Sequence, residues 1–353
     1  MKYDMLNGIK VVELGRILSA PYASKLLSDL GAEVIKIEAG DGDPYRQLPP
    51  KIGNESVWFA NFNEGKRFLK IPDLKDWASN VDVMEALKTA DILIENFRPG
   101  VLSKFGLDFV SIKKLNPKII YVSISAFGQE GSLAEKPGFD IVVQARAGYL
   151  IDYYNEKEII HNPHVYISDY ASGLFAAFLA TAALLRKERK AVHIDISMFD
   201  ILVNWSSIFY AITYHDKTFG QLIFKMDPVA YPYGVFKTKD GKRLVIAVVG
   251  PNMVKRFFEA FKEEFVKEKL NVEDFLSPLK FKELHKKVAK VIRRKSFDKI
   301  KETLDRYRLP WEEVKSGTDL INDHYLIERK LFKDIITQSG AIRVARTPIN
   351  IKL

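Results

Sequence analysis

One carboxylate stands where it could act as a nucleophile. Ser168-Asp169 comes immediately before a predicted long helix, residues 170–186, and small residues follow up to Gly173. A helix N-terminus favours negative charge, which would keep the Asp169 carboxylate ionised, and the small residues leave room for a ligand. The alternative is structural, because an aspartate in this place commonly caps its helix and contributes about 1 kcal/mol. The residues alone leave both roles open.

Several other chemistries lack the residues that they need. The chain of 353 residues contains no cysteine, which excludes disulfides, a thiol nucleophile and a cysteine-based metal site. There is no G-x-S-x-G turn for a serine hydrolase. No metal site is expected, because the six histidines show no H-E-x-x-H or comparable spacing: His161, His164, His193, His215, His285 and His324.

The first turn of the chain argues against a dinucleotide cofactor. A strand at Lys10–Leu14 leads into Gly15–Ala20, and Glu38 falls where a ribose-binding acid could lie. The turn lacks the G-x-G-x-x-G pattern that lets a pyrophosphate approach the backbone. A nucleotide-dependent oxidoreductase is therefore not favoured.

The N-terminal two thirds of the chain alternate between strands and helices. Helices are predicted between the strands, and Gly31 is expected to end the first of them. This order predicts an α/β fold with a Rossmann-like, doubly wound parallel sheet. The predicted strands are Lys10–Leu14, Glu33–Glu38, Asp91–Ile94, Ile119–Ser125 and Val192–Ile196.

The character of the sequence changes near residue 222. A hairpin-like segment, Phe236–Val248, and several basic helices predict a smaller α+β domain over residues 222–305. The large domain takes residues 1–221, and a C-terminal segment covers residues 306–353. Between Lys255 and Lys301 there are 15 Lys and Arg against 8 Asp and Glu, which accounts for most of the net charge of +9. These charges alternate with apolar residues at helical spacing, so they indicate solvated helix faces and no nucleic-acid site.

The apolar segments indicate a cytoplasmic protein with no membrane partner. No apolar run follows a basic N-terminus, so a signal peptide is not expected. The longest apolar stretch, Gly173–Leu185, is too short to span a bilayer.

Read together, the motifs of the chain resemble those of the class III CoA-transferase family, which also contains carnitine CoA-transferase, formyl-CoA transferase and alpha-methylacyl-CoA racemase. The resemblance runs in order from about residue 7 to 348, and its specificity comes from the whole set rather than from one motif. The matching segments are Gly8–Leu14 with Ala20-Pro21, Leu30–Glu38, Asn61 to Arg67, Glu95–Gly100, Ser123–Gly128, Pro137–Asp140 with Gln144-Ala145, Asp169 with Gly173, Asp195–Ser197, and Tyr231-Pro232 to Asp240-Gly241.

The resemblance implies an architecture that composition cannot show. Family members form homodimers whose two chains interlock like links, each chain with one large α/β domain and one small domain. The C-terminal segment, residues 306–353, would return to the large domain.

One residue separates the two reactions of the family. Racemases of this type carry a histidine after the glycine of a Gly-His-Asp motif, and this residue works with the aspartate at the helix start as an acid/base pair. The present chain reads Gly138-Phe139-Asp140, and phenylalanine cannot transfer a proton. The resemblance therefore favours a CoA-transferase. A 2-methylacyl-CoA racemase or epimerase and a catalytically silent acyl-CoA-binding protein remain as alternatives.

The resemblance also implies a mechanism and a set of contacts. Asp169 would attack an acyl-CoA thioester, giving a mixed anhydride and then an aspartyl-CoA thioester that a carboxylic acid acceptor attacks. The substrates would thus be acyl-CoA and a carboxylic acid, without a metal. Coenzyme A would be bound by residues at the matching positions: Leu18, Ser19, Lys66, Arg67, Asn96, Phe97, Arg98, Lys104, Phe139 and Asp140.

Three segments depart from the family pattern. Ala39 replaces a basic residue that contacts the CoA adenine in many members, and the stretch Asp152–His164 lacks the usual Gly- and Pro-containing pattern. The segment Val248–Asn252 has a single glycine, whereas members that use oxalate have a glycine-rich loop. Oxalate is therefore not the expected substrate.

Overall fold

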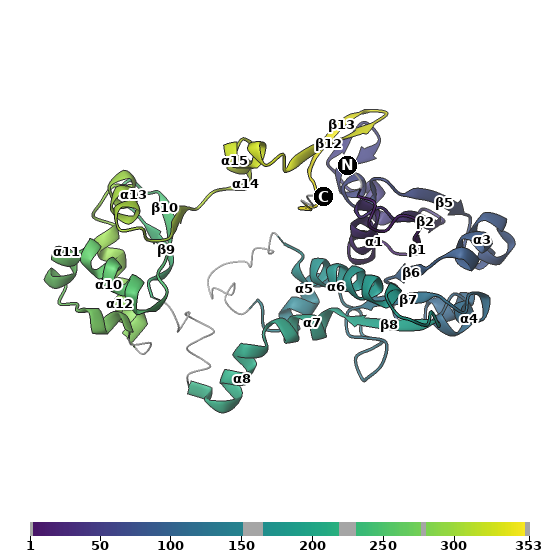
Figure 1. Ribbon diagram of the computed structural model, residues 1–353, viewed down its shortest axis with the longest axis horizontal. Helices are drawn as coiled ribbons and strands as arrows, with labels where there is room; N and C mark the ends of the chain where they lie inside the picture. Colours follow the sequence, from purple (N-terminus) through teal and green to yellow (C-terminus); the bar gives the residue numbers. More distant parts are fainter. Residues whose placement is uncertain (1–2, 151–164, 219–230, 277–279, 350–353) are drawn as a thin grey trace. The chain divides into compact units, whose positions relative to one another are not determined.

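The computed structural model of the protein describes residues 3–150, 165–218, 231–276 and 280–349 (Figure 1). The stretch Asp152–His164 and the predicted boundary at residue 222 lie outside the described residues. The chain divides into two compact units. Unit 1 holds residues 1–206 and 327–353, and unit 2 holds residues 207–326. The second unit is thus longer at both ends than the segment 222–305 expected from the sequence.

Unit 1 is built on a six-stranded parallel sheet of order β5-β2-β1-β6-β7-β8. Its central strands β6 and β7 are buried along their whole length, as expected for parallel strands covered on both faces. The strands are β1 (Lys10–Glu13), β2 (Glu33–Ala39), β5 (Arg67–Ile71), β6 (Ile92–Glu95), β7 (Ile120–Ser125) and β8 (Val192–Ser197). The prediction of a parallel α/β sheet is confirmed, and the edge strand β5 is added to it.

Helices cover both faces of this sheet (Figure 1). One face packs against α1 (Ser19–Asp29), α5 (Asp140–Arg146), α6 (Ile167–Leu184) and α7 (Met198–Trp205). The other face packs against η2 (Leu74–Ser79), α3 (Val81–Thr89), η3 (Leu102–Phe105) and α4 (Phe109–Leu115). The carboxyl ends of the strands meet at one edge of the sheet, where ligands bind in folds of this type.

Short elements complete unit 1 around helix α2 (Val57–Asn63). The C-terminal hairpin packs there through Ile335, Ile342 and Val344, which share a small core with Ala60. The remaining elements are η1 (Pro44–Gln47), the hairpin of β3 (Lys51–Ile52) and β4 (Glu55–Ser56), and the hairpin of β12 (Phe332–Thr337) and β13 (Gly340–Ala345).

Helix α6 is long and apolar enough, by length and composition, to cross a membrane. In the structure it is a core helix, because Ala171, Ala176 and Ala180 are buried in the core between the sheet and α1. Its opposite side carries the exposed apolar residues Leu174 and Phe178.

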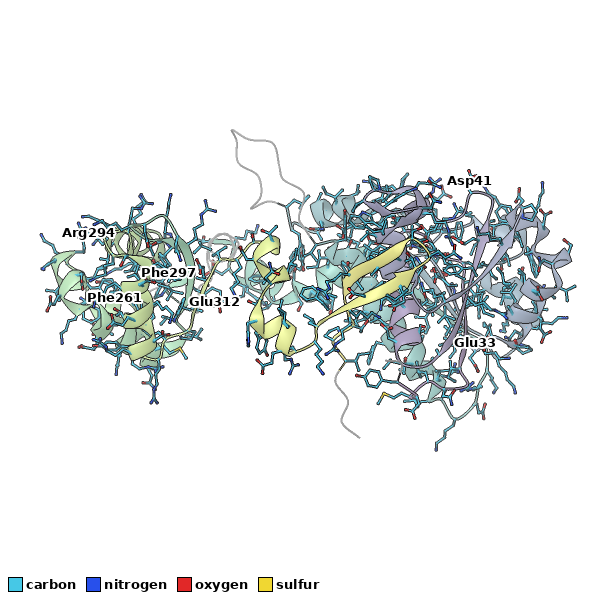
Figure 2. The ribbon with its side chains drawn as sticks, turned by 90° about the horizontal axis from the view of Figure 1, so that it is seen from above. Glu33, Asp41, Phe261, Arg294, Phe297 and Glu312 are labelled. Atoms are coloured by element: carbon cyan, nitrogen blue, oxygen red, sulfur yellow. The ribbon has the colours of Figure 1, made fainter. Side chains whose placement is uncertain are left out.

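Unit 2 packs helices on a three-stranded antiparallel sheet of order β11-β10-β9. Its core is rich in phenylalanine, and Figure 2 shows Phe261 and Phe297 within this unit and Arg294 at its outer side. The Arg294 side chain is 54% exposed, as predicted for a solvated basic helix face, and its guanidinium also pairs with Glu268 at 3.1 Å. The elements are α8 (Ser207–His215), β9 (Tyr233–Lys237), β10 (Arg243–Ala247), α10 (Gly250–Ala260), α11 (Lys262–Lys267), η5 (Val272–Leu276), α12 (Phe281–Ile292), α13 (Phe297–Arg306), β11 (Trp311–Glu313), α14 (Gly317–Ile321) and, at its boundary, α15 (His324–Glu328).

Candidate active site

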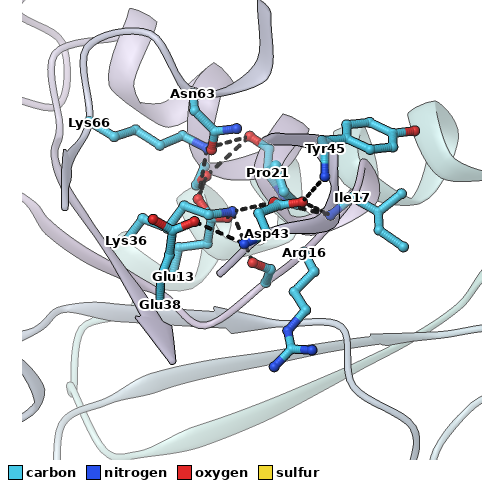
Figure 3. A network of polar contacts seen from close by, with 12 residues as sticks. Glu13, Arg16, Ile17, Pro21, Lys36, Glu38, Asp43, Tyr45, Asn63 and Lys66 are labelled. Carbon is cyan, nitrogen blue, oxygen red and sulfur yellow. Dashed lines mark hydrogen bonds and ion pairs between the residues drawn. The ribbon is translucent and has the colours of Figure 1, made fainter. Parts of the chain in front are cut away.

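A buried ionic network lies under the turn that joins β1 to α1 (Figure 3). The Glu13 carboxylate pairs with the ammonium groups of both Lys36 and Lys66 at 2.7 Å. Lys36 also contacts Asp43 at 2.8 Å, and all four side chains are buried. Charges this deep are tolerated only when they are paired and hydrogen-bonded. Burial by itself would raise the pKa of Glu13, but the two lysines outweigh it and lower this pKa to about 2.

The network fixes the backbone of the turn. Lys36 donates to the Gly15 carbonyl at 2.9 Å, and Lys66 donates to the Pro21 carbonyl at 2.9 Å. The Asp43 carboxylate accepts the Ile17 amide at 3.1 Å. Ile17 has φ 67°, a left-handed conformation that a β-branched residue adopts only under constraint. The buried charges supply that constraint, so the turn has one defined shape.

Asn96, at the end of β6, ties this turn to the next loop. Its amide group accepts from the Arg16 amide at 2.9 Å and donates to the Arg16 carbonyl at 2.9 Å. It also donates to the Ser19 hydroxyl at 2.9 Å. The loop after β6 and the N-terminus of α1 therefore form one hydrogen-bonded assembly at the carboxyl edge of the sheet.

Helix α6 brings Asp169 to this assembly. A Cβ atom added at Gly173 would lie 2.7 Å from the Ser19 carbonyl oxygen, so only glycine lets the two helices approach this closely. One turn earlier on α6, Asp169 lies beside Ser19, whose hydroxyl and backbone amide favour the ionised form of the Asp169 carboxyl group. The carboxylate thus faces the N-terminus of α1, where unpaired N–H groups favour an anion.

The structure corrects the expected start of the long helix. Helix α6 begins at Ile167, its N-cap is Tyr166, and Asp169 lies in the first turn. The reading of Asp169 as an N-cap is therefore wrong. The amide groups of this turn are capped from another helix, because Asp140 Oδ1 accepts from the Ser168 amide at 2.8 Å and from the Asp169 amide at 3.4 Å.

The protonation of Asp169 also differs from the sequence expectation of a carboxylate kept ionised. Burial raises the pKa of Asp169 to about 7, and the negative charge of Asp140 acts in the same direction. The hydrogen bonds from Ser19 oppose this shift without cancelling it. Near neutral pH the group is therefore divided between a carboxylate and a carboxylic acid, and the carboxylate is poorly solvated.

Asp169 lines a cavity of about 300 Å³ that lies within unit 1. Phe139 lies at this cavity with 70% of its surface exposed. The lining residues come from loops, from the end of β7 and from the starts of α1, α6 and α7: Arg16, Ile17, Ser19, Asn96, Phe97, Arg98, Pro99, Ile124, Ser125, Ala126, Ala134, Lys136, Gly138, Phe139, Asp169 and Met198.

Six of the eleven site residues expected from the sequence line this one cavity: Asp169, Ser19, Asn96, Phe97, Arg98 and Phe139. The other five lie elsewhere. Leu18 is fully buried in an apolar cluster with Tyr45 and Phe62. Arg67 and Lys104 are exposed and do not line the cavity.

Lys66 and Asp140 are committed to internal contacts. The Lys66 ammonium is held by Glu13, Asn63 and the Pro21 carbonyl, and Lys66 does not line the cavity. Asp140 is buried and receives the Gln144 amide at 2.5 Å in addition to the α6 amides. Lys66 and Asp140 therefore hold the backbone around the site through these contacts and do not line its cavity.

Two cations at the cavity were not found from the sequence. Arg16 lies in the turn before α1, with its guanidinium 4.9 Å from the centre of the Phe97 ring. Lys136 directly precedes the segment Pro137–Asp140. Their positions beside two recognised motifs were a usable signal, because a phosphate-bearing ligand needs nearby cations. Among the described residues, no three metal-binding side chains converge.

The sequence of the chain is similar to those of known CoA-transferases. Residues 6–353 match CoA-transferase family III, so the chain belongs to this family. It is 35% identical to an acetyl-CoA:oxalate CoA-transferase of Acetobacter aceti, over 66% of this chain and 61% of that protein. It is 32% identical to a succinate–glutarate CoA-transferase of Agrobacterium fabrum, over 71% of this chain and 65% of that protein. The match to each of these two relatives covers less than two thirds of the relative's own length.

A solved structure supports the fold. A CAIB/BAIF family protein from Brucella suis superposes with a TM-score of 0.77 and 26% sequence identity, covering 99% of this chain and 93% of that one. The mixed α/β fold with a parallel central sheet is therefore shared with a protein of this family.

Proposed function

We propose that the protein transfers coenzyme A from an acyl-CoA donor to a carboxylic acid acceptor, with Asp169 as the nucleophile. The observation that carries the proposal is the position of the Asp169 carboxylate. It lies in a cavity, at the N-terminus of α1, with its pKa raised to about 7 by burial and by Asp140. A poorly solvated carboxylate is more nucleophilic than one in water, and part of the population is ionised at neutral pH.

In the first step an Asp169 oxygen attacks the thioester carbonyl carbon of the donor. The C–S bond breaks, coenzyme A leaves as a thiolate, and a mixed anhydride joins the acyl group to Asp169. The thiolate then attacks the aspartyl carbonyl carbon, the donor carboxylate leaves, and an aspartyl-CoA thioester remains. Each attack places negative charge on a carbonyl oxygen, and N–H groups at the N-terminus of α1 are suited to stabilise it.

The second half repeats these steps in reverse order. The acceptor carboxylate attacks the aspartyl thioester and expels the CoA thiolate, giving a new mixed anhydride. The thiolate attacks the acyl carbon of the acceptor, which leaves as acyl-CoA and restores the Asp169 carboxylate. No net proton is consumed, so a single carboxylate suffices, in keeping with Phe139 occupying the position of the acid/base histidine.

For coenzyme A, the described cavity supports a revised set of contacts. Arg16, Arg98 and Lys136 are the cations of the lining, and they suit the phosphate groups. Asn96 and Phe97, in the loop after β6, also line this cavity. Lys66 and Asp140 have no direct part, because their polar groups are already bonded within the protein.

Self-association and a cytoplasmic location are part of the same proposal. Phe178 and Leu174 form an exposed apolar face on α6, and none of the residues of α8 is buried within this chain. Surfaces of this kind commonly become buried against a partner, so we propose a homodimer.

A transfer assay with matched variants tests the proposal. Asp169→Ala should reduce the rate of CoA transfer between succinyl-CoA and a panel of carboxylates at least a thousandfold. Asp82→Ala is the control, since Asp82 is an exposed first-turn aspartate on α3, and its rate should stay within twofold. An active Asp169→Ala enzyme would overturn the proposal. Solvent deuterium at the α-carbon of recovered 2-methylacyl-CoA, without transfer, would favour the racemase alternative.

A further inference from the structure

A second cluster of polar residues lies on the opposite face of the sheet from α6. It borders a cavity of about 210 Å³ that is also lined by Arg98, so this one arginine borders both cavities. Glu95, at the end of β6, is buried at the inner side of this second cavity. The proposed transfer reaction leaves Glu95 without a role, although Glu95 directly precedes the loop at the active-site cavity.

Hydrogen bonds connect this cluster to the loop. Glu95 Oε2 accepts the Phe97 amide at 2.7 Å. Ser123 is the register partner of Glu95 on the neighbouring strand β7, where its hydroxyl favours the ionised form of the Glu95 carboxyl group. On its other side, Ser123 Oγ lies 2.9 Å from His193 Nε2. The His193 ring is stacked on Phe109, which fixes its plane. The contacts therefore run across three adjacent strands, from β8 to β7 to β6.

The protonation of Glu95 decides which groups donate and which accept in the hydrogen bonds between Glu95, Ser123 and His193. When Glu95 is ionised, Ser123 donates its only hydroxyl proton to Glu95, so Ser123 can only accept from His193. The Phe97 amide then donates to a full negative charge, which makes a stronger bond than a neutral acceptor would. When Glu95 is protonated, its own O–H can donate to Ser123, and the bond from Phe97 loses its charge assistance.

We propose that Glu95, held by Ser123 and His193, is a positioning residue that fixes the Asn96–Arg98 loop for coenzyme A only in its ionised form. This inference rests on the proposed CoA-transfer function. The loop is connected to the surroundings of the nucleophile, since Asn96 donates to the Ser19 hydroxyl and Ser19 lines the same cavity as Asp169. The ionisation of Glu95 thus affects the position of the Asn96–Arg98 loop at the active-site cavity.

The surroundings of Glu95 place its titration in the physiological range. Burial raises the pKa of Glu95 to about 7, the bonds from Ser123 and Phe97 oppose this, and the charge of Asp195 adds to it. The other titratable or charged groups at this cavity are Arg98, Asp108, Tyr121 and His193. Burial lowers the pKa of His193, so this imidazole is neutral when Glu95 titrates.

The test measures CoA binding rather than turnover. Isothermal titration calorimetry between pH 5.5 and 8.5 gives the CoA dissociation constant of Asp169→Asn and of Asp169→Asn with Glu95→Gln. The first variant removes the titration of Asp169, and the ionisation of the CoA phosphates is common to both proteins. Glutamine imitates the protonated carboxyl group, so the ratio of the two constants should be near one at pH 5.5 and about fivefold at pH 8.5.

Two further variants keep Glu95 and shift its titration in opposite directions. Ser123→Ala removes a contact that stabilises the ionised form of Glu95. The pH at which the ratio of the two CoA dissociation constants is halfway through its change should therefore be higher. Asp195→Asn removes a nearby negative charge and should move the midpoint to lower pH. A ratio that does not change with pH, or two shifts of the same sign, would overturn this inference alone. Absence of CoA binding at every pH would overturn the proposed function as well.

Discussion

The Asp140 carboxylate caps helix α6 from outside that helix, because its Oδ1 atom accepts both the amide and the hydroxyl of Ser168, at 2.8 and 2.7 Å. The next residue is Asp169. This contact sets the orientation of the first turn of α6, and it also places a second negative charge beside the proposed nucleophile. Asp140 therefore affects both the position and the protonation of Asp169.

Replacing Asp140 by asparagine should separate these two effects. The asparagine oxygen can still accept from Ser168, but the negative charge is lost. The pKa of Asp169 should then fall below about 7. Since attack requires the ionised carboxylate, the rise of the transfer rate with pH should move to lower pH in Asp140→Asn. A pH profile of the rate measures this, and an unchanged or upward-shifted midpoint would contradict it.

The close approach of α6 and α1 predicts a strong effect of one methyl group. In Gly173→Ala the new Cβ would lie 2.7 Å from the Ser19 carbonyl oxygen, so one helix must move. We expect a loss of about 1–3 kcal/mol in the free energy of unfolding, and a lower transfer rate because Ser19 contacts Asp169. Urea denaturation and kinetics measure both. Ala182→Ser, on the exposed side of α6, should change neither, and a Gly173→Ala protein of native stability and rate would contradict the argument.

Lys66 and Arg67 are neighbours in the sequence, but only Lys66 belongs to the buried network, so their replacement should affect stability differently. Lys66→Met removes one partner of the buried Glu13 carboxylate and should lower the free energy of unfolding by about 3 kcal/mol. Arg67→Met is the matched control, because Arg67 is exposed and its replacement should cost less than about 0.5 kcal/mol. Equal losses in urea denaturation would be evidence against the network.

The same network predicts stability against acid. The pKa of Glu13 is lowered to about 2 in the folded protein from 4.5. Its contribution is therefore complete above the pKa of the unfolded chain and is lost as pH falls through about 2. Lys66→Met removes one of the two cations that lower this pKa, so its stability should begin to fall at a higher pH than that of the wild type.

The exposed face of α6 predicts the effect of a charge on self-association. Phe178→Asp should reduce the fraction of dimer, measured by size-exclusion chromatography with light scattering. Val110→Asp is the control, since Phe178 and Val110 are both 62% exposed but Val110 lies on α4. A monomeric wild type, or dimers in both variants, would contradict this placement of the interface.

Local pattern was sufficient for much of the fold. Apolar runs such as Ile119–Ser125 predicted the central strands, because strands buried on both faces carry few polar residues. Strand β5 was missed because Arg67–Ile71 lies at the sheet edge and mixes basic with apolar residues. The start of α6 was misplaced because its first turn is capped by Asp140, which is 28 residues away in sequence from Ser168.

The position of a residue at the cavity was predictable where that residue belongs to a motif of its own. Asp169 and the Asn96–Arg98 loop are of this kind, and they line one cavity. Lys66 belongs to a recognised motif, yet its partner Glu13 lies 53 residues earlier. Spacing along the chain carries no information about such a pair, so a buried structural lysine could not be distinguished from a ligand-binding one.

The central claim is covalent chemistry at Asp169, and intact-protein mass spectrometry tests it most directly. The protein is incubated with a panel of acyl-CoA thioesters, trapped with hydroxylamine or borohydride, and digested for peptide mapping. We expect an adduct or its trapped product on the peptide that contains Asp169, absent in Asp169→Ala and retained in Asp82→Ala. Transfer of coenzyme A without any modification of Asp169, or with an adduct on another residue, would contradict it.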